Sequence, residues 1–231
     1  MPAVVRGSVY WCDFGPNVGR ELSDSHPALV ISNSRLNSIS STAIVLPMSS
    51  AGPADQHLSN YVLIADVNSW ASVRQIKSVR EGQLGDKIGE ASSLELEMAL
   101  QLLATRLAIT RKGPSSAQEV QTSRLIEPGT IWDVEVFDEH DNHTAWNTPM
   151  LILDYNDGNN IAIAVEVRYE QREGSPIRIP IEIADSETSA SALIHNVRSV
   201  DLGARHIDKI GAVSESSLAL VLFSLFDAIY E

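Results

Sequence analysis

The sequence lacks a second cysteine and any long apolar run. Its single cysteine, Cys12, cannot form a disulfide within the chain, which fits a reducing compartment. No segment reaches the roughly 18 consecutive apolar residues that a membrane-spanning helix needs, and residues 1–11, MPAVVRGSVYW, lack the pattern of a signal peptide. We therefore expect a cytoplasmic protein with no membrane partner. Because Cys12 lies in an apolar strand pattern with no histidine close by in the sequence, we interpret it as core filling rather than a nucleophile.

Basic residues are scarce in the second half of the chain. Residues 1–112 hold 10 Lys and Arg against 10 Asp and Glu, whereas residues 113–231 hold 7 against 20, so the second half carries the whole formal charge of −13. Neutralisation of phosphates supplies most of the non-specific affinity for nucleic acids. We therefore expect the first half to do most of any RNA binding.

An internal repeat is the most informative feature of the sequence. The tetrapeptide DKIG occurs at residues 86–89 and again at 208–211, a shift of 122 positions. The same shift places RGSVYW over PGTIWD and HPALVI over TPMLIL, and a shift of 121 places IKSV over VRSV. Matches in one order at nearly one offset predict a duplicated domain, with copies at 1–110 and 125–231 and a linker at 111–124.

Each copy is expected to contain several strands followed by a helix. The apolar runs SVYWCDF, ALVIS, TAIVLPM, YVLIAD and SVRQIKSV of the first copy predict strands. Ser92 and Glu95 form a capping box for a helix, and Leu96, Leu100, Leu103 and Leu107 give it one apolar face. The final segment, SSLALVLFSLFDAIYE, is apolar almost all round, so we expect burial on more than one side, partly against the other copy. A membrane-surface helix is less favoured, because the segment has no basic face.

Three stretches of the first copy resemble toxins of the MazF/PemK type from type II toxin–antitoxin systems: RGSVYWCDFGPNVGRELSDSHPALVISNSRLN, TAIVLPMSS and RQIKSVREGQLGDKIG. The resemblance covers nearly the whole first copy, while the second copy keeps the skeleton but little of the motif. It implies a mainly β fold with C-terminal helices (α+β), built as two tandem SH3-like barrel domains. In that family two protomers pair and RNA lies across the pair, so the tandem chain would form an intramolecular pseudo-dimer.

The resemblance also implies a catalytic set for cleaving single-stranded RNA without a metal or other cofactor. The family's arginine before the conserved proline is His26 here, its catalytic Thr or Ser falls on Ser49, and its loop glutamate falls on Glu21. Lys77 stands where a late strand of the family has an arginine. The residues expected to contact RNA are Arg20, Ser50, Arg74 and Arg80.

The change from arginine to His26 alters the chemistry that the site can perform. Attack of the ribose 2′-OH needs a base, a cation or donor for the crowded phosphorane, and an acid for the leaving oxygen. Arginine is suited to the second task, since it never loses its charge and binds two phosphate oxygens. Histidine suits acid or base work near neutral pH and holds a phosphate charge only while it is protonated.

Each candidate also has a structural interpretation. His26 precedes Pro27 and would then simply end a loop, Ser49 and Ser50 begin a stretch of turn composition, and the cations would form a solvated strand face. In the second copy Thr148 and Arg168 take the positions of His26 and Ser49, and neither is a general base. The segment Asp138–His143, DEHDNH, suggests metal ligation, although an acidic loop is the favoured interpretation.

Three functions from different classes remain open at this point. The first is an endoribonuclease toxin whose activity resides in the first copy. The second is a catalytically inactive member of the family that binds a protein, such as an antitoxin-like segment or a cognate toxin. The third is a DNA- or gyrase-directed binder like the CcdB-type toxins, which no feature of the sequence specifically favours.

Overall fold

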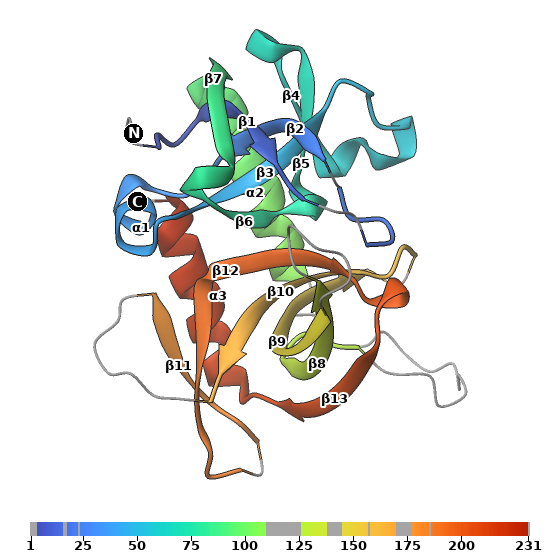
Figure 1. Cartoon of the computed structure of the whole chain (residues 1–231), viewed down its shortest axis with the longest axis vertical. Coiled ribbons are helices and arrows are strands. Elements are labelled where there is room, and N and C mark those ends of the chain that lie inside the picture. Colours follow the sequence, from blue (N-terminus) through green and yellow to red (C-terminus); the bar gives the residue numbers. More distant parts are fainter. Residues whose placement is uncertain are drawn as a thin grey trace.

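The structure is a computed structural model that describes residues 4–15, 18–22, 24–109, 126–137, 145–156, 158–169, 177–184 and 186–230, without the side chains of residues 55–57, 108 and 109. The predicted linker 111–124 and the segment Asp138–His143 lie outside this range, so the linker boundaries and the metal alternative stay predictions. The two halves of the chain form two neighbouring bodies, one above the other in Figure 1. Among the described residues, no helix is long and apolar enough to cross a membrane.

The first half forms an antiparallel sheet in the order β7-β1-β2-β3-β6. Its strands are β1 (Ser8–Asp13), β2 (Ser25–Val30), β3 (Thr42–Ser49), β4 (Tyr61–Ile64), β5 (Ser69–Ser72), β6 (Lys77–Arg80) and β7 (Leu84–Glu90). Its helices are α1 (Ser34–Ser40) and α2 (Ser93–Ile109), with 3-10 turns η1 (Asp55–Asn60), η2 (Ala65–Val67), η3 (Val73–Gln75) and η4 (Glu81–Gln83). The strand expected over residues 72–79 is divided: Ser72 ends β5, η3 redirects the chain, and β6 begins at Lys77.

The second half repeats this order as β13-β8-β9-β10-β12. Its strands are β8 (Thr130–Phe137), β9 (Ala145–Asn156), β10 (Ile161–Arg168), β11 (Arg178–Glu182), β12 (Ser189–Asp201) and β13 (Ile207–Ala212). The 3-10 turn η5 (Leu202–Ala204) precedes β13, and the chain ends in α3 (Glu215–Tyr230). The fold is thus mainly β with C-terminal helices, in two tandem SH3-like copies, as predicted.

Strand register confirms the repeat residue by residue. Cys12 pairs with His26 in the first copy, and Val134 pairs with Thr148 in the second, each partner lying 122 positions further on. The β1–β7 and β8–β13 ladders share one register shift, which lies between Lys87 and Gly89 in the first copy and between Lys209 and Gly211 in the second. The first ladder has a further shift between Tyr10 and Cys12. An irregularity at equivalent positions of both ladders is expected of a duplicated domain and not of two unrelated sheets.

The two copies join where equivalent strands meet. Lys77 of β6 pairs with Arg198 of β12, and these residues are 121 positions apart, as the repeat requires. Ser199 strengthens the junction by donating its N–H to the carbonyl oxygen of Ile76 and its hydroxyl to that of Arg74, both over 2.7 Å. Antiparallel pairing of equivalent residues is the arrangement of a two-fold dimer, so the chain is an intramolecular pseudo-dimer.

The C-terminal helices end against the opposite copy. Arg106 of α2 forms an ion pair with Asp154 of β9 in the second copy. The last turn of α3 meets the first copy, where the carbonyl oxygen of Ala228 accepts the N–H of Asn33 over 2.9 Å and that of Tyr230 accepts the Arg6 guanidinium over 3.1 Å. Each copy therefore depends on the other to complete its helical layer.

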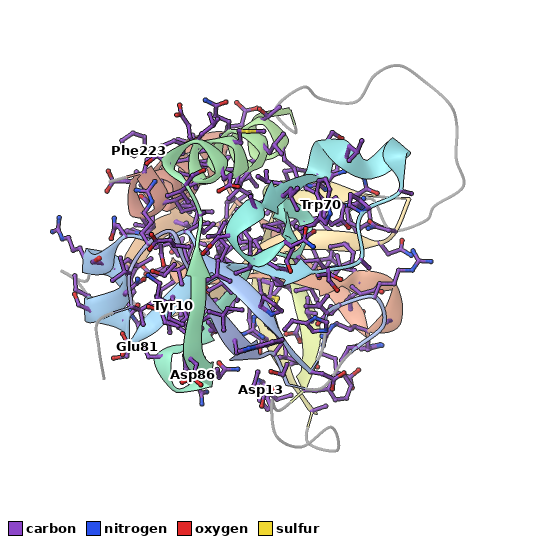
Figure 2. All side chains as sticks on the ribbon, turned by 90° about the horizontal axis from the view of Figure 1, so that it is seen from above. Tyr10, Asp13, Trp70, Glu81, Asp86 and Phe223 are labelled. Carbon is purple, nitrogen blue, oxygen red and sulfur yellow. The ribbon has the colours of Figure 1, made fainter. Side chains whose placement is uncertain are left out.

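Helix α3 is less completely buried than its sequence suggests. Its inner face contains Val221, Leu222, Leu225 and Ile229, which are all buried. Its outer face leaves Phe223 69% exposed, and Figure 2 shows this ring on the outside of the molecule beside the helices. As expected, α3 is buried both against the sheet and against the other copy. A third side, which contains Phe223, faces solvent.

The core has one shared part and two smaller ones. The largest buried cluster runs beneath α2 and α3 and combines strands of both copies. A second cluster belongs to the first copy alone and contains Cys12, Phe14 and Val30, so the interpretation of Cys12 as core filling is confirmed. A third cluster belongs to the second copy and is centred on Trp132 and Ile152.

Candidate functional site

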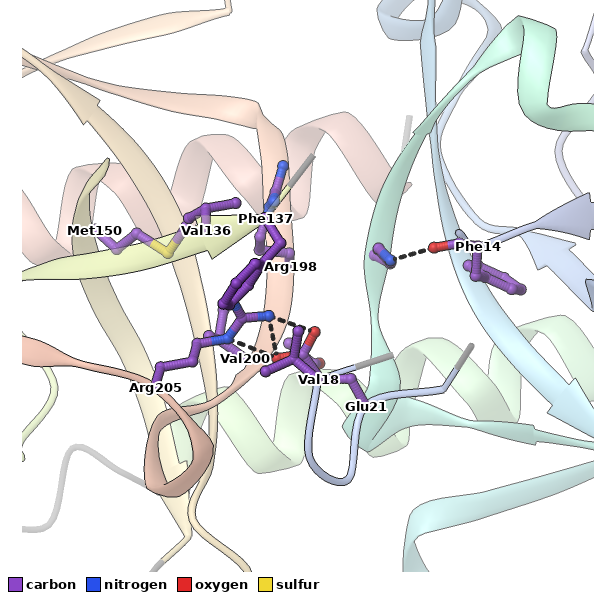
Figure 3. A pocket seen from close by; sticks show the side chains of 11 residues that line it. Phe14, Val18, Glu21, Val136, Phe137, Met150, Arg198, Val200 and Arg205 are labelled. Atoms are coloured by element: carbon purple, nitrogen blue, oxygen red, sulfur yellow. Dashed lines mark hydrogen bonds and ion pairs between the residues drawn. The ribbon is translucent and has the colours of Figure 1, made fainter. Parts of the chain in front are cut away.

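The β1–β2 loop that carries Glu21 crosses from the first copy to the second. Arg205, which follows η5, donates from Nη2 to both carboxylate oxygens of Glu21 over 2.7 and 2.8 Å, and from Nε over 3.0 Å (Figure 3). The backbone N–H of Asp201 adds a fourth bond to the same carboxylate, over 2.9 Å. The side chains of Glu21 and Arg205 are only 13% and 6% exposed. Glu21 therefore lies in a contact between the copies.

Lys77 faces the same junction from β6. Its ammonium group donates to the carbonyl oxygen of Phe14 over 3.0 Å and lies 5.7 Å from the centre of the Phe14 ring. Beside it is a small cavity of about 30 Å³, drawn in Figure 3. Both copies contribute to its lining, which consists of Phe14, Val18, Glu21, Lys77, Val136, Phe137, Met150, Arg198, Ser199, Val200 and Arg205. A cavity of this size has room for about one water molecule and none for a nucleotide.

His26 and Ser49 belong to neighbouring strands and share a face of the sheet. Ala28 of β2 pairs with Pro47 of β3, so two residues further along each strand His26 and Ser49 have the same parity. The ladder does not continue to them, because β3 turns there to pair with β5, with Ser49 opposite Trp70. Both side chains are partly exposed, and the Ser49 hydroxyl accepts the N–H of Ala51 over 3.2 Å.

Lys77 shares this face with His26 and Ser49. It pairs with Val45, which lies in the buried cluster of the first copy. Val45, Pro47 and Ser49 are two residues apart along β3, so their side chains point to the same face of the sheet. The face therefore carries an imidazole, a hydroxyl and an ammonium group, of the kinds that the predicted chemistry needs. Strand parity thus assigns three of the four predicted catalytic residues to one side of the sheet, with Ser49 just beyond the β2–β3 ladder.

The other predicted cations are scattered. Arg74 lies on the helix side, near Arg106 and Asp154, where burial and then the charge of Arg106 lower its pKa below the usual value. Along β6, Lys77 and Val79 point to one face of the sheet, so Arg80, the next residue, points to the other face. Arg20 and Ser50 are exposed. The structure does not gather the predicted RNA-binding residues into one patch.

In the second copy, the position equivalent to Ser49 holds an arginine whose charge is balanced by a neighbouring carboxylate. Arg168, equivalent to Ser49, forms an ion pair with Glu166. Glu166 is buried and also accepts the Nδ2 group of Asn196 over 2.8 Å. Thr148, equivalent to His26, is buried as well. A cation whose charge is already balanced makes a poor phosphate ligand, so the two copies differ chemically as well as in net charge.

Sequence reasoning missed Arg205 and Asp201. They lie 184 and 180 positions from Glu21, and no motif connects the two segments. Arg198 had a usable signal, since the repeat makes it the equivalent of Lys77. Among the described residues, no group of three His, Cys, Asp or Glu side chains is placed to hold a metal ion.

Comparison with known proteins identifies the family. The profile of the PemK-like, MazF-like toxins of type II toxin–antitoxin systems matches residues 5–107 and again residues 127–226. The two matches together span most of the chain and coincide with the two copies. The chain therefore belongs to this family, as a tandem duplication.

Several solved structures are similar to one copy. An endoribonuclease from mycobacterial species is 22% identical, with a TM-score of 0.39, over 47% of this chain and 94% of that one. A mycobacterial endoribonuclease in complex with its cognate antitoxin is 21% identical, with a TM-score of 0.39, over 49% and 100%. A MazE–MazF complex from Deinococcus radiodurans is 19% identical, with a TM-score of 0.38, over 46% and 95%. No curated protein matches the chain.

Proposed function

We propose that this toxin-family protein is a cytoplasmic endoribonuclease that cleaves single-stranded RNA without a metal ion, with its active site in the first copy. The observation that carries the proposal is the shared face of His26, Ser49 and Lys77. The family membership of both copies and the endoribonuclease activity named for similar proteins support the reaction class. Glu21 completes the proposed set by anchoring the adjacent loop, not by transferring a proton.

Each residue of the proposed site has a distinct task. His26 transfers protons, taking one from the ribose 2′-OH or giving one to the leaving 5′-oxygen. Ser49 donates a hydrogen bond to the phosphorane, and Lys77 supplies a positive charge beside it. The imidazole stands where the family has a permanent cation, and unlike a guanidinium it is able to take up and release a proton during the reaction.

The decisive experiment is cleavage of a single-stranded RNA pool by His26 variants. We expect His26→Ala to abolish cleavage, because it removes the group proposed to transfer the proton. His206→Ala, which removes an exposed histidine of the second copy, is the matched control and should retain activity. Cleavage by wild type and His26→Ala at equal rates would exclude His26 from the reaction.

A catalytically inactive, protein-binding role is the second candidate. It is favoured by the balanced charge of Arg168 and by a junction cavity too small for a nucleotide. On this hypothesis the wild type does not cleave RNA, and His26→Arg restores some cleavage by returning a permanent bidentate donor. The partner would be an antitoxin-like protein, as in the complexes of similar proteins. Co-purification with the product of a short adjacent reading frame tests this.

A further inference from the structure

We infer that the second copy acts as a clamp on the β1–β2 loop of the first, with Arg205 as a positioning residue and Glu21 as its anchor. The clamp consists of Asp201 and Arg205, which hold Arg20 and Glu21. It gives the acidic second copy a task that requires no RNA contact. The clamp itself does not depend on the proposed function; only its effect on catalysis rests on that proposal.

The carboxylate of Glu21 is occupied by the clamp. Its Oε1 atom accepts three hydrogen bonds and its Oε2 atom one, and a guanidinium lies against it in bidentate geometry. Bidentate, charge-assisted bonds between buried groups are the strong class of side-chain interaction. Proton transfer by Glu21 would require breaking them, so anchoring is the role that fits this geometry.

Contacts within the second copy orient the Arg205 side chain. Its Nη1 atom donates to the carbonyl oxygen of Glu135 over 2.7 Å, and its guanidinium lies 5.7 Å from the centre of the Phe137 ring. Both residues belong to β8 of the second copy. The guanidinium is therefore oriented by its own copy and presents its remaining donors to the loop.

The loop backbone is fixed as well as the side chain. The N–H of Arg20 donates to Asp201 Oδ2 over 2.9 Å, and its carbonyl oxygen accepts the Gln75 amide over 3.1 Å. Gly19 has a φ of +63°, and a Cβ there would lie 2.4 Å from Asp201 Oδ2. A side chain at this position would therefore push the loop away from the clamp.

The clamp also bears on the proposed active face. The loop begins at Phe14, whose carbonyl oxygen holds the Lys77 ammonium group over 3.0 Å. Glu21 and Lys77 line the same small cavity. The position of the loop thus limits where the Lys77 charge lies, and through it the second copy acts on the first.

Limited trypsin digestion of the full chain tests the clamp without any activity assay. Arg20 is exposed and offers a cleavable bond within the clamped backbone. We expect Arg205→Gln and Glu21→Gln each to speed cleavage after Arg20 by about tenfold, because native-state proteolysis follows local opening. Lys209→Gln, which removes an exposed cation of β13, is the control and should leave the rate unchanged. Equal rates in wild type and both clamp variants would overturn the inference.

A charge exchange separates anchoring from proton transfer. The double variant Glu21→Arg with Arg205→Glu should partly restore protection of the Arg20 N–H from hydrogen exchange, since the ion pair is re-formed in reverse. Hydrogen exchange is the readout for this variant because the new arginine adds a trypsin site. If the wild type cleaves RNA, each single variant should raise KM more than it lowers kcat, and the exchange should recover part of that loss. Cleavage lost in Glu21→Gln through kcat alone, and not recovered by the exchange, would show that Glu21 transfers protons and that anchoring is not its role. If the wild type does not cleave RNA, the proposed function fails while the digestion still decides the clamp.

Discussion

At the scale of single residues, ionisation of a few partly buried groups links stability to pH. Burial lowers the pKa of His195 below 6.5, with a smaller lowering from Arg178, while the carbonyl of Ile177 and the carboxylate of Glu166 oppose the shift. Glu95 has a lowered pKa because it accepts the N–H of Ala65 and the groups of Ser92. Both shifts mean that the unfolded chain binds more protons than the folded one in the acid range.

Stability should therefore fall as the pH drops below about 6.5, first through His195 and then, below about 4.5, through Glu95. Replacing His195 by Gln removes its titration, so the decline that begins just below pH 6.5 should flatten, while the decline below about pH 4.5 remains. Urea denaturation at closely spaced pH values measures both. A steeper decline in the variant would contradict the assignment.

The ion pair between Arg106 and Asp154 is a second residue-scale test. Both side chains are largely buried, and Arg106 also contacts Asn60 over 3.4 Å. We expect Arg106→Ala to destabilise the chain by about 3 kcal/mol, because a buried carboxylate loses its partner. The double variant Arg106→Met with Asp154→Leu should cost less than the single one. Additive losses in denaturant unfolding would show that the two groups do not act as a pair.

At the scale of elements, α2 and α3 follow their sequences to different degrees. The predicted capping box of α2 is confirmed, since Glu95 accepts the N–H of Ser92 over 2.7 Å and donates its own N–H to the Ser92 hydroxyl over 3.3 Å. Its leucine face is likewise buried, with Leu100, Leu103 and Leu107 nearly inaccessible. Helix α3 is apolar on both faces, so its sequence pattern does not show which face is buried and which is exposed.

Two alanine substitutions in α3 distinguish these faces. Leu225 is fully buried, so Leu225→Ala should destabilise the chain by about 2–5 kcal/mol through the cavity it leaves. Leu220 is 47% exposed, and Leu220→Ala should change stability by less than about 0.5 kcal/mol. The midpoints of urea unfolding measure the difference. Equal losses would mean that the outer stripe is covered in solution.

At the scale of the whole molecule, the two copies form one folding unit. The largest buried cluster draws on both, and β6 and β12 pair across the junction. We expect residues 125–231 expressed alone to be poorly soluble, because separation exposes the parts of this cluster and of α3 that the first copy covers. A monomeric fragment with sharp cooperative unfolding would contradict this.

The two halves of the chain differ in net charge, and this difference should govern where RNA binds. The neutral first half should bind RNA weakly and with strong salt dependence, through the face that carries Lys77. Lys77→Glu should therefore lower the affinity for single-stranded RNA more than Arg168→Glu, since Arg168 is already paired with Glu166. Fluorescence anisotropy with labelled RNA at several salt concentrations measures this. Equal losses would indicate that RNA crosses both copies.

The sequence by itself determined the duplication, most strands and the α2 cap, because these depend on local periodicity and on one constant offset. Tertiary structure alone decided that Glu21 meets Arg205, that Arg74 lies among Arg106 and Asp154, and that Phe223 faces solvent. These contacts depend on how two sheets join at Lys77 and Arg198. A pairing between segments about 180 positions apart leaves no trace in local pattern, since each segment satisfies its own strand or turn without reference to the other.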